Sequence, residues 1–196
     1  MRRLLLVAIL LVGLTLTLTA CGGDDAPDTA PVSTVEAGAK LALTGARTTI
    51  DIDGITGGVL SGSGVSIEPV DPATVKDSSF DIPIVGGEIT SGTLTGVIEH
   101  EGGIAFVAGD KRIEYTDLRI DTAAEQVLAG TNGSTPIFDL DVTDLTRTED
   151  SGTIVVRGAV ALVGTDAAAE LNDGLEVSAF RPRQVIGKLT IRATGD

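Results

Sequence analysis

The sequence predicts an all-β domain, either a β-sandwich or a barrel-like fold, with one short helix near the C-terminus. Short apolar–polar alternations recur about every 8 to 12 residues, the spacing of strands in sandwiches and barrels. Glycine-rich turns separate them, and 25 of the 196 residues are glycine. The chain has no Trp, one Tyr and four Phe, so Val, Ile, Leu and Ala must build the core. No repeat of about 20 to 50 residues is visible, which argues against a solenoid or propeller.

The alternation is plainest in residues 48–53, where Ile50 and Ile52 face one way and two aspartates face the other. Residues 153–163 are apolar on both faces near their end, which predicts a central strand. The other predicted strands are residues 65–70, 80–84, 93–99, 103–108, 111–120, 126–129, 137–142 and 185–193.

Three local features refine these strands. Pro83 lacks an N–H to donate, so it predicts an edge position or a bulge in its strand. The inward-facing set in residues 111–120 changes parity, which predicts a bulge near residues 116–117. The Asn132-Gly133 pair favours a type I′ turn, because both residues tolerate positive φ, and so predicts a hairpin.

The single predicted helix covers residues 165–172. Thr165 is an N-cap candidate, an acidic residue and three alanines follow it, and Gly174 comes just past the expected end. A final strand then closes the domain, which we expect to span residues 46–196.

The N-terminus carries the most specific motif. Arg2 and Arg3 precede an apolar run, and Leu18-Thr19-Ala20-Cys21 follows it. This pattern is similar to a bacterial lipoprotein signal peptide with its lipobox, whose cysteine is diacylated and becomes the new N-terminus. A transmembrane anchor is the alternative, but it needs about 20 apolar residues and this run is shorter. Residues 1–20 are therefore predicted to be a signal peptide.

Cys21 is then the predicted lipid anchor at the extracytoplasmic face of the cell membrane. Two acyl chains hold a protein firmly, since each buried methylene contributes about 0.8 kcal/mol. It is also the only cysteine in the chain, which leaves no thiol for a disulfide or a zinc–thiolate site. Residues 21–45 are small, acidic and proline-bearing, which predicts a flexible tether.

Charge excludes one class of partner. Without the first 20 residues, 12 basic side chains face 28 acidic ones, which gives a net charge of −16. Nucleic acid is excluded because its phosphates require a basic surface. Attachment to an anionic membrane must likewise come from the lipid and not from charge.

No enzymatic motif is present. A Ser-His-Asp triad could only be built around His100, the single histidine, and no G-x-S-x-G elbow occurs. The glycine-rich residues 57–58 and 62–64 lack the lysine of a phosphate-binding loop. We therefore predict a non-enzymatic binding or structural module without a cofactor, whose ligand is an unknown protein or small molecule.

Residues 92–104, 117–122 and 168–172 together resemble a pattern in functionally uncharacterised, secreted β-rich proteins of actinobacteria. The glycine-histidine-glycine element around His100 is also similar to the HtaA-type haem-binding domains of that group, which are β-sandwiches. This resemblance implies the alternative function, a haem- or metal-binding surface lipoprotein of the iron acquisition type. Those domains bind haem through a tyrosine in an early helical region. This chain has no tyrosine before Tyr115, so that ligand has no matching position.

Two candidate sites follow from side-chain chemistry. His100 and Tyr115 are the only His and Tyr, and a histidine-activated tyrosine is a sensible haem ligand. The alternative places the histidine in a turn and the tyrosine half-buried on a strand. Asp139, Asp141 and Asp144, with further aspartates on a neighbouring strand, offer the oxygen ligands of calcium. Alternation on a strand with one wet face explains them equally well.

The sequence leaves a third possibility open. An apolar interior cavity for lipid is neither supported nor excluded, because core and cavity linings have the same strand pattern.

Overall fold

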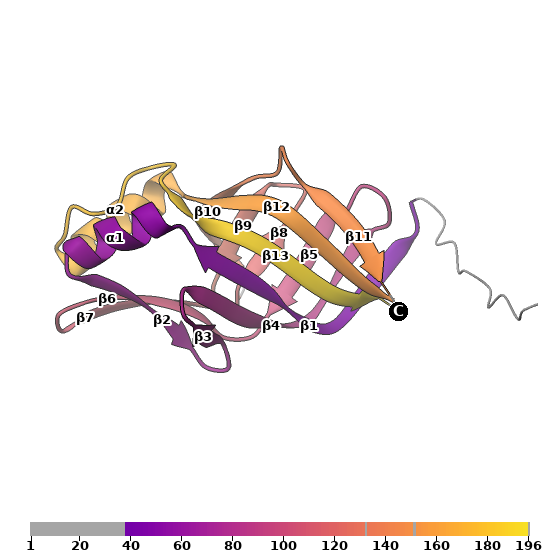
Figure 1. The fold of residues 1–196 in the computed structure, drawn as a ribbon, viewed down its shortest axis with the longest axis horizontal. Coiled ribbons are helices and arrows are strands. Elements are labelled where there is room, and N and C mark those ends of the chain that lie inside the picture. The colour runs from indigo at the N-terminus through magenta and orange to yellow at the C-terminus, as the bar shows by residue number, and fades with distance from the viewer. Residues whose placement is uncertain (1–37, 132, 151, 196) are drawn as a thin grey trace, which may run out of the picture. The chain divides into compact units, whose positions relative to one another are not determined.

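The computed structural model describes residues 38–195 apart from residues 132 and 151. Eight antiparallel strands form a closed barrel, because β1 pairs with β13 on one side and with β4 on the other (Figure 1). In order around the barrel they are β1 (Lys40–Ile52), β13 (Val185–Gly195), β12 (Thr153–Val163), β10 (Thr135–Asp141), β9 (Gln126–Ala129), β8 (Arg119–Asp121), β5 (Gly96–His100) and β4 (Ser79–Thr90). The predicted all-β, barrel-like fold class is confirmed.

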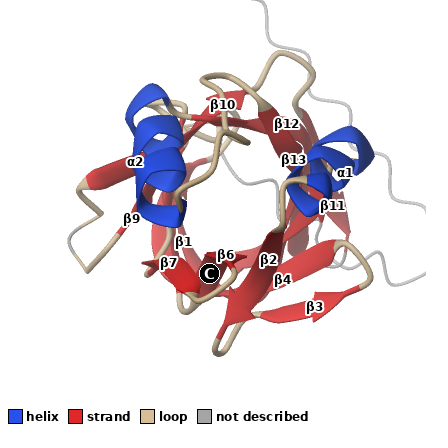
Figure 2. Ribbon diagram, turned by 90° about the vertical axis from the view of Figure 1, so that its left-hand side faces the viewer, coloured by secondary structure: helices blue, strands red, loops and turns tan. Residues whose placement is uncertain are grey.

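Further elements extend the barrel. β3 (Thr74–Lys76) pairs with β4, and β11 (Thr146–Asp150) pairs with β12. A separate three-stranded sheet consists of β2 (Val65–Val70), β6 (Gly103–Ala108) and β7 (Lys111–Thr116). This sheet lies at the same end of the barrel as α1 (Gly54–Gly62) and α2 (Thr165–Leu175), here called the helix end. Figure 2 looks at this end and shows the two helices on either side of it.

The core follows the strand alternation. In β4, Phe80, Ile82 and Ile84 are buried while the residues between them are only half-buried. At the helix end the ring of Phe106 packs edge-on against Tyr115 and Phe180, with centroid distances of 6.2 and 5.3 Å. No helix among the described residues is long and apolar enough to cross a membrane.

The strand that contains Pro83 is not at an edge. β4 has barrel partners on both sides, so the predicted edge position is wrong. Its outer neighbour changes from β3, which pairs as far as Asp81, to β5, which pairs from Ile84 onward. The missing N–H of Pro83 falls in this gap, and a register shift follows at once between Ile84 and Gly86. The bulge is therefore the alternative that the structure shows.

The predicted single strand at residues 111–120 is two strands, β7 and β8, in different sheets. The chain leaves the three-stranded sheet and enters the barrel at Asp117, whose φ of 51° is left-handed. The parity change in the sequence thus marks a switch between sheets. The predicted hairpin of β9 and β10 is confirmed, while its turn residue Asn132 lies outside the described residues.

Three predicted boundaries differ from the structure. β1 begins at Lys40, so residues 40–45 belong to a strand and not to the tether. The C-terminal helix is confirmed, but Gly164 is its N-cap in place of Thr165. Gly174 lies within its last turn and not past its end. It faces Ile113, whose Cδ1 would lie 2.6 Å from a Cβ at this position. The left-handed residue after this helix is Glu176.

The sequence pattern does not predict α1. Its sequence is rich in glycine, which is unfavourable in helices, so propensity gave no signal. The Asp53 carboxylate accepts hydrogen bonds of 3.0 Å from the backbone N–H groups of Ile55 and Thr56, and so caps the helix. Burial of Leu60 holds the helix against the domain. A cap and a tertiary contact, not local propensity, therefore form α1.

Candidate ligand-binding cavity

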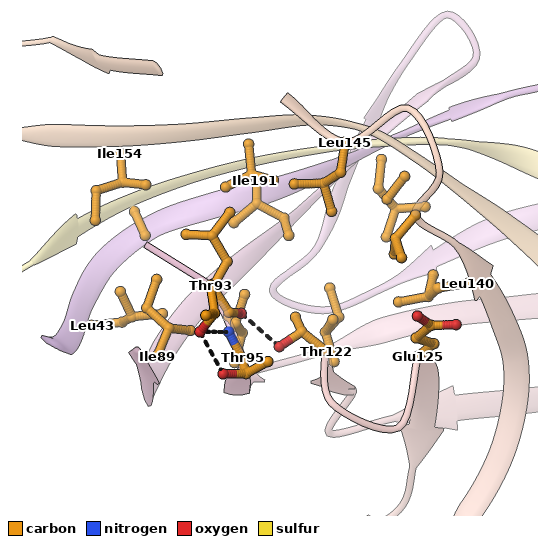
Figure 3. Close-up of a pocket in the computed structure, with 18 residues that line it drawn as sticks. Leu43, Ile89, Thr93, Thr95, Thr122, Glu125, Leu140, Leu145, Ile154 and Ile191 are labelled. Atoms are coloured by element: carbon orange, nitrogen blue, oxygen red, sulfur yellow. Dashed lines mark hydrogen bonds between the residues drawn. The ribbon is translucent and has the colours of Figure 1, made fainter. Parts of the chain in front are cut away.

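A cavity of about 210 Å³ lies inside the barrel at the end away from the helices, here called the cavity end. Its lining residues are drawn in Figure 3. The helices come after the ends of two strands, α1 after β1 and α2 after β12. The cavity is lined by Leu43 and Ile154, which lie near the beginnings of the same strands, so it is at the opposite end of the barrel. Fourteen of its 18 lining residues are Leu, Ile, Val or Ala. The cavity is therefore almost wholly aliphatic.

Strand alternation places this lining. In β13 the inward positions are Leu189, Ile191 and Ala193, which alternate as a strand requires. In β12 the inward set shifts by one residue at a bulge next to Gly158, so that Ala159 again faces the cavity.

Only glycine fits at this bulge. The φ of Gly158 is 97°, and a Cβ there would lie 2.1 Å from the carbonyl oxygen of Asp144. A close backbone approach thus helps to set the shape of the cavity wall.

Polar groups gather on one side of the cavity. Thr93, Thr95, Thr122 and Glu125 are its four lining residues that are not aliphatic. The Thr122 hydroxyl donates to the Leu94 carbonyl at 2.7 Å and accepts from a backbone N–H at 2.8 Å. The hydroxyls of Thr93 and Thr95 lie 2.7 Å apart and share a hydrogen bond (Figure 3).

The size and chemistry of this cavity favour binding over catalysis. An engineered apolar cavity of about 150 Å³ holds benzene, so this one accommodates a single ring or a short alkyl segment. Its only ionisable lining group is Glu125. Neither an acid–base pair nor an activated nucleophile is therefore present among the described residues that line it.

His100 lies in the barrel interior, apart from this cavity. It is the last residue of β5 and not a turn residue, and its side chain is buried. Nδ1 donates to the Leu118 carbonyl at 3.0 Å, so Nε2 accepts from the Thr48 hydroxyl at 2.7 Å. Burial lowers the pKa of His100 to about 4, while the hydrogen bond to Leu118 acts in the opposite direction. The ring is therefore neutral at physiological pH.

Tyr115 lies at the helix end, on β7. It is fully buried and not half-buried as expected, and its hydroxyl has no hydrogen-bond partner among the described residues. Burial raises the pKa of Tyr115 well above its usual range, and the nearby Glu170 carboxylate raises it further. The phenol is thus held in its protonated form.

The structure does not bring these two rings together. Among the described residues no hydrogen bond joins His100 to Tyr115, and the cavities that His100 lines beside Thr48 and beside Val85 do not include Tyr115. The histidine ring faces an aliphatic pocket in the barrel, and the tyrosine ring packs on Phe106. A shared role in ligand binding stays a prediction.

The three aspartates proposed for calcium lie at the end of β10 and in the turn after it. No group of three His, Cys, Asp or Glu side chains in the described residues could hold a metal ion. Asp141 instead accepts a hydrogen bond of 3.0 Å from the Thr143 N–H, and its bonds with Thr143 lower the pKa of this carboxyl. Asp51 of β1 is not on a neighbouring strand, since β10 pairs with β9 and β12, and Asp53 is the N-cap of α1. The described residues therefore provide no cluster of metal ligands at the predicted calcium site of Asp139, Asp141 and Asp144.

No family model matches the sequence. No curated protein matches it either. A search of solved structures, however, finds a similar fold. The fold is that of the C-terminal domain of HtaA. This domain, from Corynebacterium glutamicum, superposes with a TM-score of 0.58 over 80% of this chain and 99% of its own, at 13% sequence identity.

A second similar structure is the haem-binding protein HtaB of the same organism. It covers 81% of this chain and 96% of its own, with a TM-score of 0.48 and 9% identity. The likeness to the HtaA domain confirms the predicted HtaA-type resemblance at the level of the fold.

Proposed function

We propose that this chain is a lipid-anchored binding module of the bacterial cell envelope that takes a small apolar ligand into its barrel. The observation that carries this proposal is the aliphatic cavity of about 210 Å³ at the cavity end. Burial of apolar ligand surface there contributes about 25 cal/mol per Å², and the polar groups on one side fix the orientation of the ligand. A single ring or a short alkyl chain matches both the size and the lining.

The described chain enters the domain at this same end. Gly38 donates a backbone hydrogen bond of 2.9 Å to the carbonyl of Ser91, which lies two residues before Thr93 of the cavity. The segment that leads to Cys21 therefore leaves the described part of the chain on the side of the cavity. This arrangement supports a module that exchanges apolar ligands near a membrane.

Anchoring is tested by growing cells that express the full chain with an alkyne-tagged fatty acid. We expect tag on the wild-type protein and none on the Cys21→Ser variant, which lacks the acceptor thiol. A tag that persists in this variant, or wild-type protein that carries none, would contradict the anchor.

Ligand binding is tested with a photoreactive octanol analogue on the full chain in phosphatidylcholine nanodiscs. Cross-links are mapped by peptide mass spectrometry, which separates probe in the cavity from probe in the lipid. We expect labels on cavity residues, and their loss in Ala159→Leu, which fills the cavity. Ala169→Leu makes the same change on an exposed face of α2 and should label like the wild type. Labelling spread outside the cavity, or unaffected by Ala159→Leu, would overturn the proposal.

Haem is the second candidate, favoured by the fold shared with the HtaA domain and by the sequence resemblance to HtaA-type haem-binding domains. Two observations argue against haem binding. A haem macrocycle is much larger than the single ring that a cavity of this size holds. The Tyr115 phenol is also protonated and buried, whereas an iron ligand must be an accessible phenolate. Haem would therefore require another surface or a rearrangement at the helix end.

A haem titration of the full chain distinguishes the two candidates. A saturable Soret shift that is lost in Tyr115→Phe would establish haem ligation by this tyrosine. No Soret shift at all would remove the haem candidate and leave the apolar-ligand proposal unaffected.

A further inference from the structure

The polar side of the cavity has a definite charge character. Glu125 is the only ionisable residue among the 18 that line the cavity, and the lining contains no Lys, Arg or His. A ligand whose alkyl part fills the aliphatic space must place its head group beside this carboxylate. The charge of the head group therefore decides how well the ligand fits.

The position of Glu125 is fixed by its backbone. Its φ of 56° is left-handed, and its carbonyl accepts a hydrogen bond of 2.7 Å from the N–H of Leu140. The turn before it is held by Asp121, whose carboxylate accepts from the N–H groups of Ala123 and Ala124 at 3.0 and 2.9 Å. In Figure 3 the Glu125 side chain lies beside Leu140, on the polar side of the cavity. The backbone of Glu125 is thus held beside the cavity, and its carboxylate belongs to the lining.

No cation among the described residues pairs with this carboxylate, since none of the seven ion pairs there includes Glu125. Lys40, near the start of β1, is engaged by Glu88 at 2.5 Å. The field of the strongly acidic domain adds to the local effect.

The hydroxyl groups beside Glu125 offer few hydrogen-bond donors that could stabilise an anionic head group. Thr122 already uses its hydrogen in its bond to the Leu94 carbonyl. The hydroxyls of Thr93 and Thr95 have two hydrogens between them, and one of these forms the hydrogen bond that joins the two groups. The polar side thus offers several acceptor sites and about one free donor, which suits a head group that donates hydrogen bonds.

We infer that the cavity selects neutral and cationic amphiphiles, such as alkyl alcohols and alkylammonium ions, and discriminates against fatty-acid anions through Glu125. This inference rests on the proposed apolar-ligand function and names the ligand class of the same site. Because Glu125 is exposed, the charge effect is that of a surface pair. We expect a change of about twofold to fivefold for each charged head group when the carboxylate is removed.

The test uses octylammonium, octanol and octanoate as competitors of the photoreactive octanol analogue, on the full chain in phosphatidylcholine nanodiscs at neutral pH. Each competitor is compared with itself between wild type and Glu125→Gln, so that its partition into lipid cancels. The concentration of octylammonium that displaces half of the analogue should be about twofold to fivefold higher in the variant than in the wild type. The corresponding concentration of octanoate should be lower by a similar factor. Octanol should be unchanged. Glu101→Gln removes an equal charge from an exposed turn outside the cavity lining and should behave like the wild type.

The outcomes separate this inference from the proposed function. If Glu125→Gln shifts octanoate and octylammonium in the same direction or leaves both unchanged, or if Glu101→Gln reproduces its effect, charge selection by Glu125 is overturned while cavity labelling by the neutral analogue still stands. If the neutral analogue itself fails to label the cavity, the proposed function falls, and this inference falls with it.

Discussion

The two ends of the barrel are built from the same alternating strands yet are filled differently. At the helix end, Phe106 is fully buried between two other rings, and Leu171 and Leu175 of α2 are buried as well. At the cavity end the barrel is lined by short aliphatic side chains, and about 210 Å³ stays open. Alternation alone thus decides which residues point inward, and side-chain size and a helical cover decide whether the interior is full.

The distribution of aromatic residues explains this difference. All five lie toward the helix end. Phe138 pairs with the last residue of β12, and Phe80 pairs with Ile50 near the end of β1. Phe106, Tyr115 and Phe180 form the ring cluster at that end. No aromatic residue lines the cavity. A closed barrel needs large side chains to fill its centre, and this chain places all of its rings at one end.

The largest expected effect comes from the same truncation made at each end. Leu171→Ala should lower the free energy of unfolding by about 3 to 5 kcal/mol, because its side chain is enclosed on all sides. Leu189→Ala should cost about 2 to 3 kcal/mol, because this side chain borders the cavity and makes fewer contacts there. Urea unfolding of the full chain followed by circular dichroism measures both. Equal losses would show that the cavity end is as tightly packed as the helix end.

The same contrast shows how much of the fold the sequence could predict. The strand at residues 48–53 and the hairpin of β9 and β10 were predictable because their signals are local. Closure was not, since it depends on pairing between Arg47–Asp51 and Ser79–Pro83, which are distant in the chain. α1 was hidden for a similar reason, because an Asp53 cap and the burial of Leu60 stabilise it in spite of its glycines.

The candidate site was harder still to predict. Ile191 lines the cavity and Ile50 packs in the core, yet both occupy inward positions of alternating strands. Nothing in the local pattern separates a residue that faces a filled interior from one that faces a space. The one available signal was the shortage of aromatic residues, and it gave no position along the chain. His100 and Tyr115 drew attention as single residues, and the structure places them in separate packed environments.

The second expected effect is a pH dependence of stability caused by His100 in the packed interior. His100 is neutral when folded because burial lowers its pKa to about 4, against about 6.5 in the unfolded chain. Below pH 6.5 His100 binds a proton in the unfolded state but not in the folded state. The free energy of unfolding therefore falls as the pH drops from 6.5 to 4. The total loss from this group is about 3 kcal/mol.

Urea unfolding of the wild type and of His100→Gln across this pH range measures that loss. Other carboxylates titrate in both proteins, so the difference between the two curves isolates the histidine. We expect the variant to lose about 3 kcal/mol less between pH 6.5 and pH 4. Parallel curves would show that His100 is solvated, and the packed interior would then extend less far than described.

The third effect adds volume at each end. Ala168→Leu enlarges a buried residue of α2 and should cost about 1 to 3 kcal/mol through overpacking. Ala159→Leu enlarges a buried residue beside the cavity and should change stability by less than about 1 kcal/mol, since the new atoms enter open space. The exposed Ala169→Leu is the matched control for both. A cost at Ala159 equal to that at Ala168 would mean that the cavity does not persist in solution.

The smallest effect tests whether water reaches each end. Thr48→Val removes the donor of the bond to His100 Nε2 in the packed interior, where nothing replaces it, and should cost about 1 to 2 kcal/mol. Thr122→Val removes both the acceptor of the Gly96 N–H and the donor to the Leu94 carbonyl at the cavity, where the threonine is only half-buried. Water can take over both bonds, so the cost should stay below about 1 kcal/mol. Urea unfolding of both variants gives the difference, and equal costs would show that the polar side of the cavity is as dry as the core. An apolar ligand that excludes this water should then raise the cost of Thr122→Val toward that of Thr48→Val, which links the stability measurement to binding.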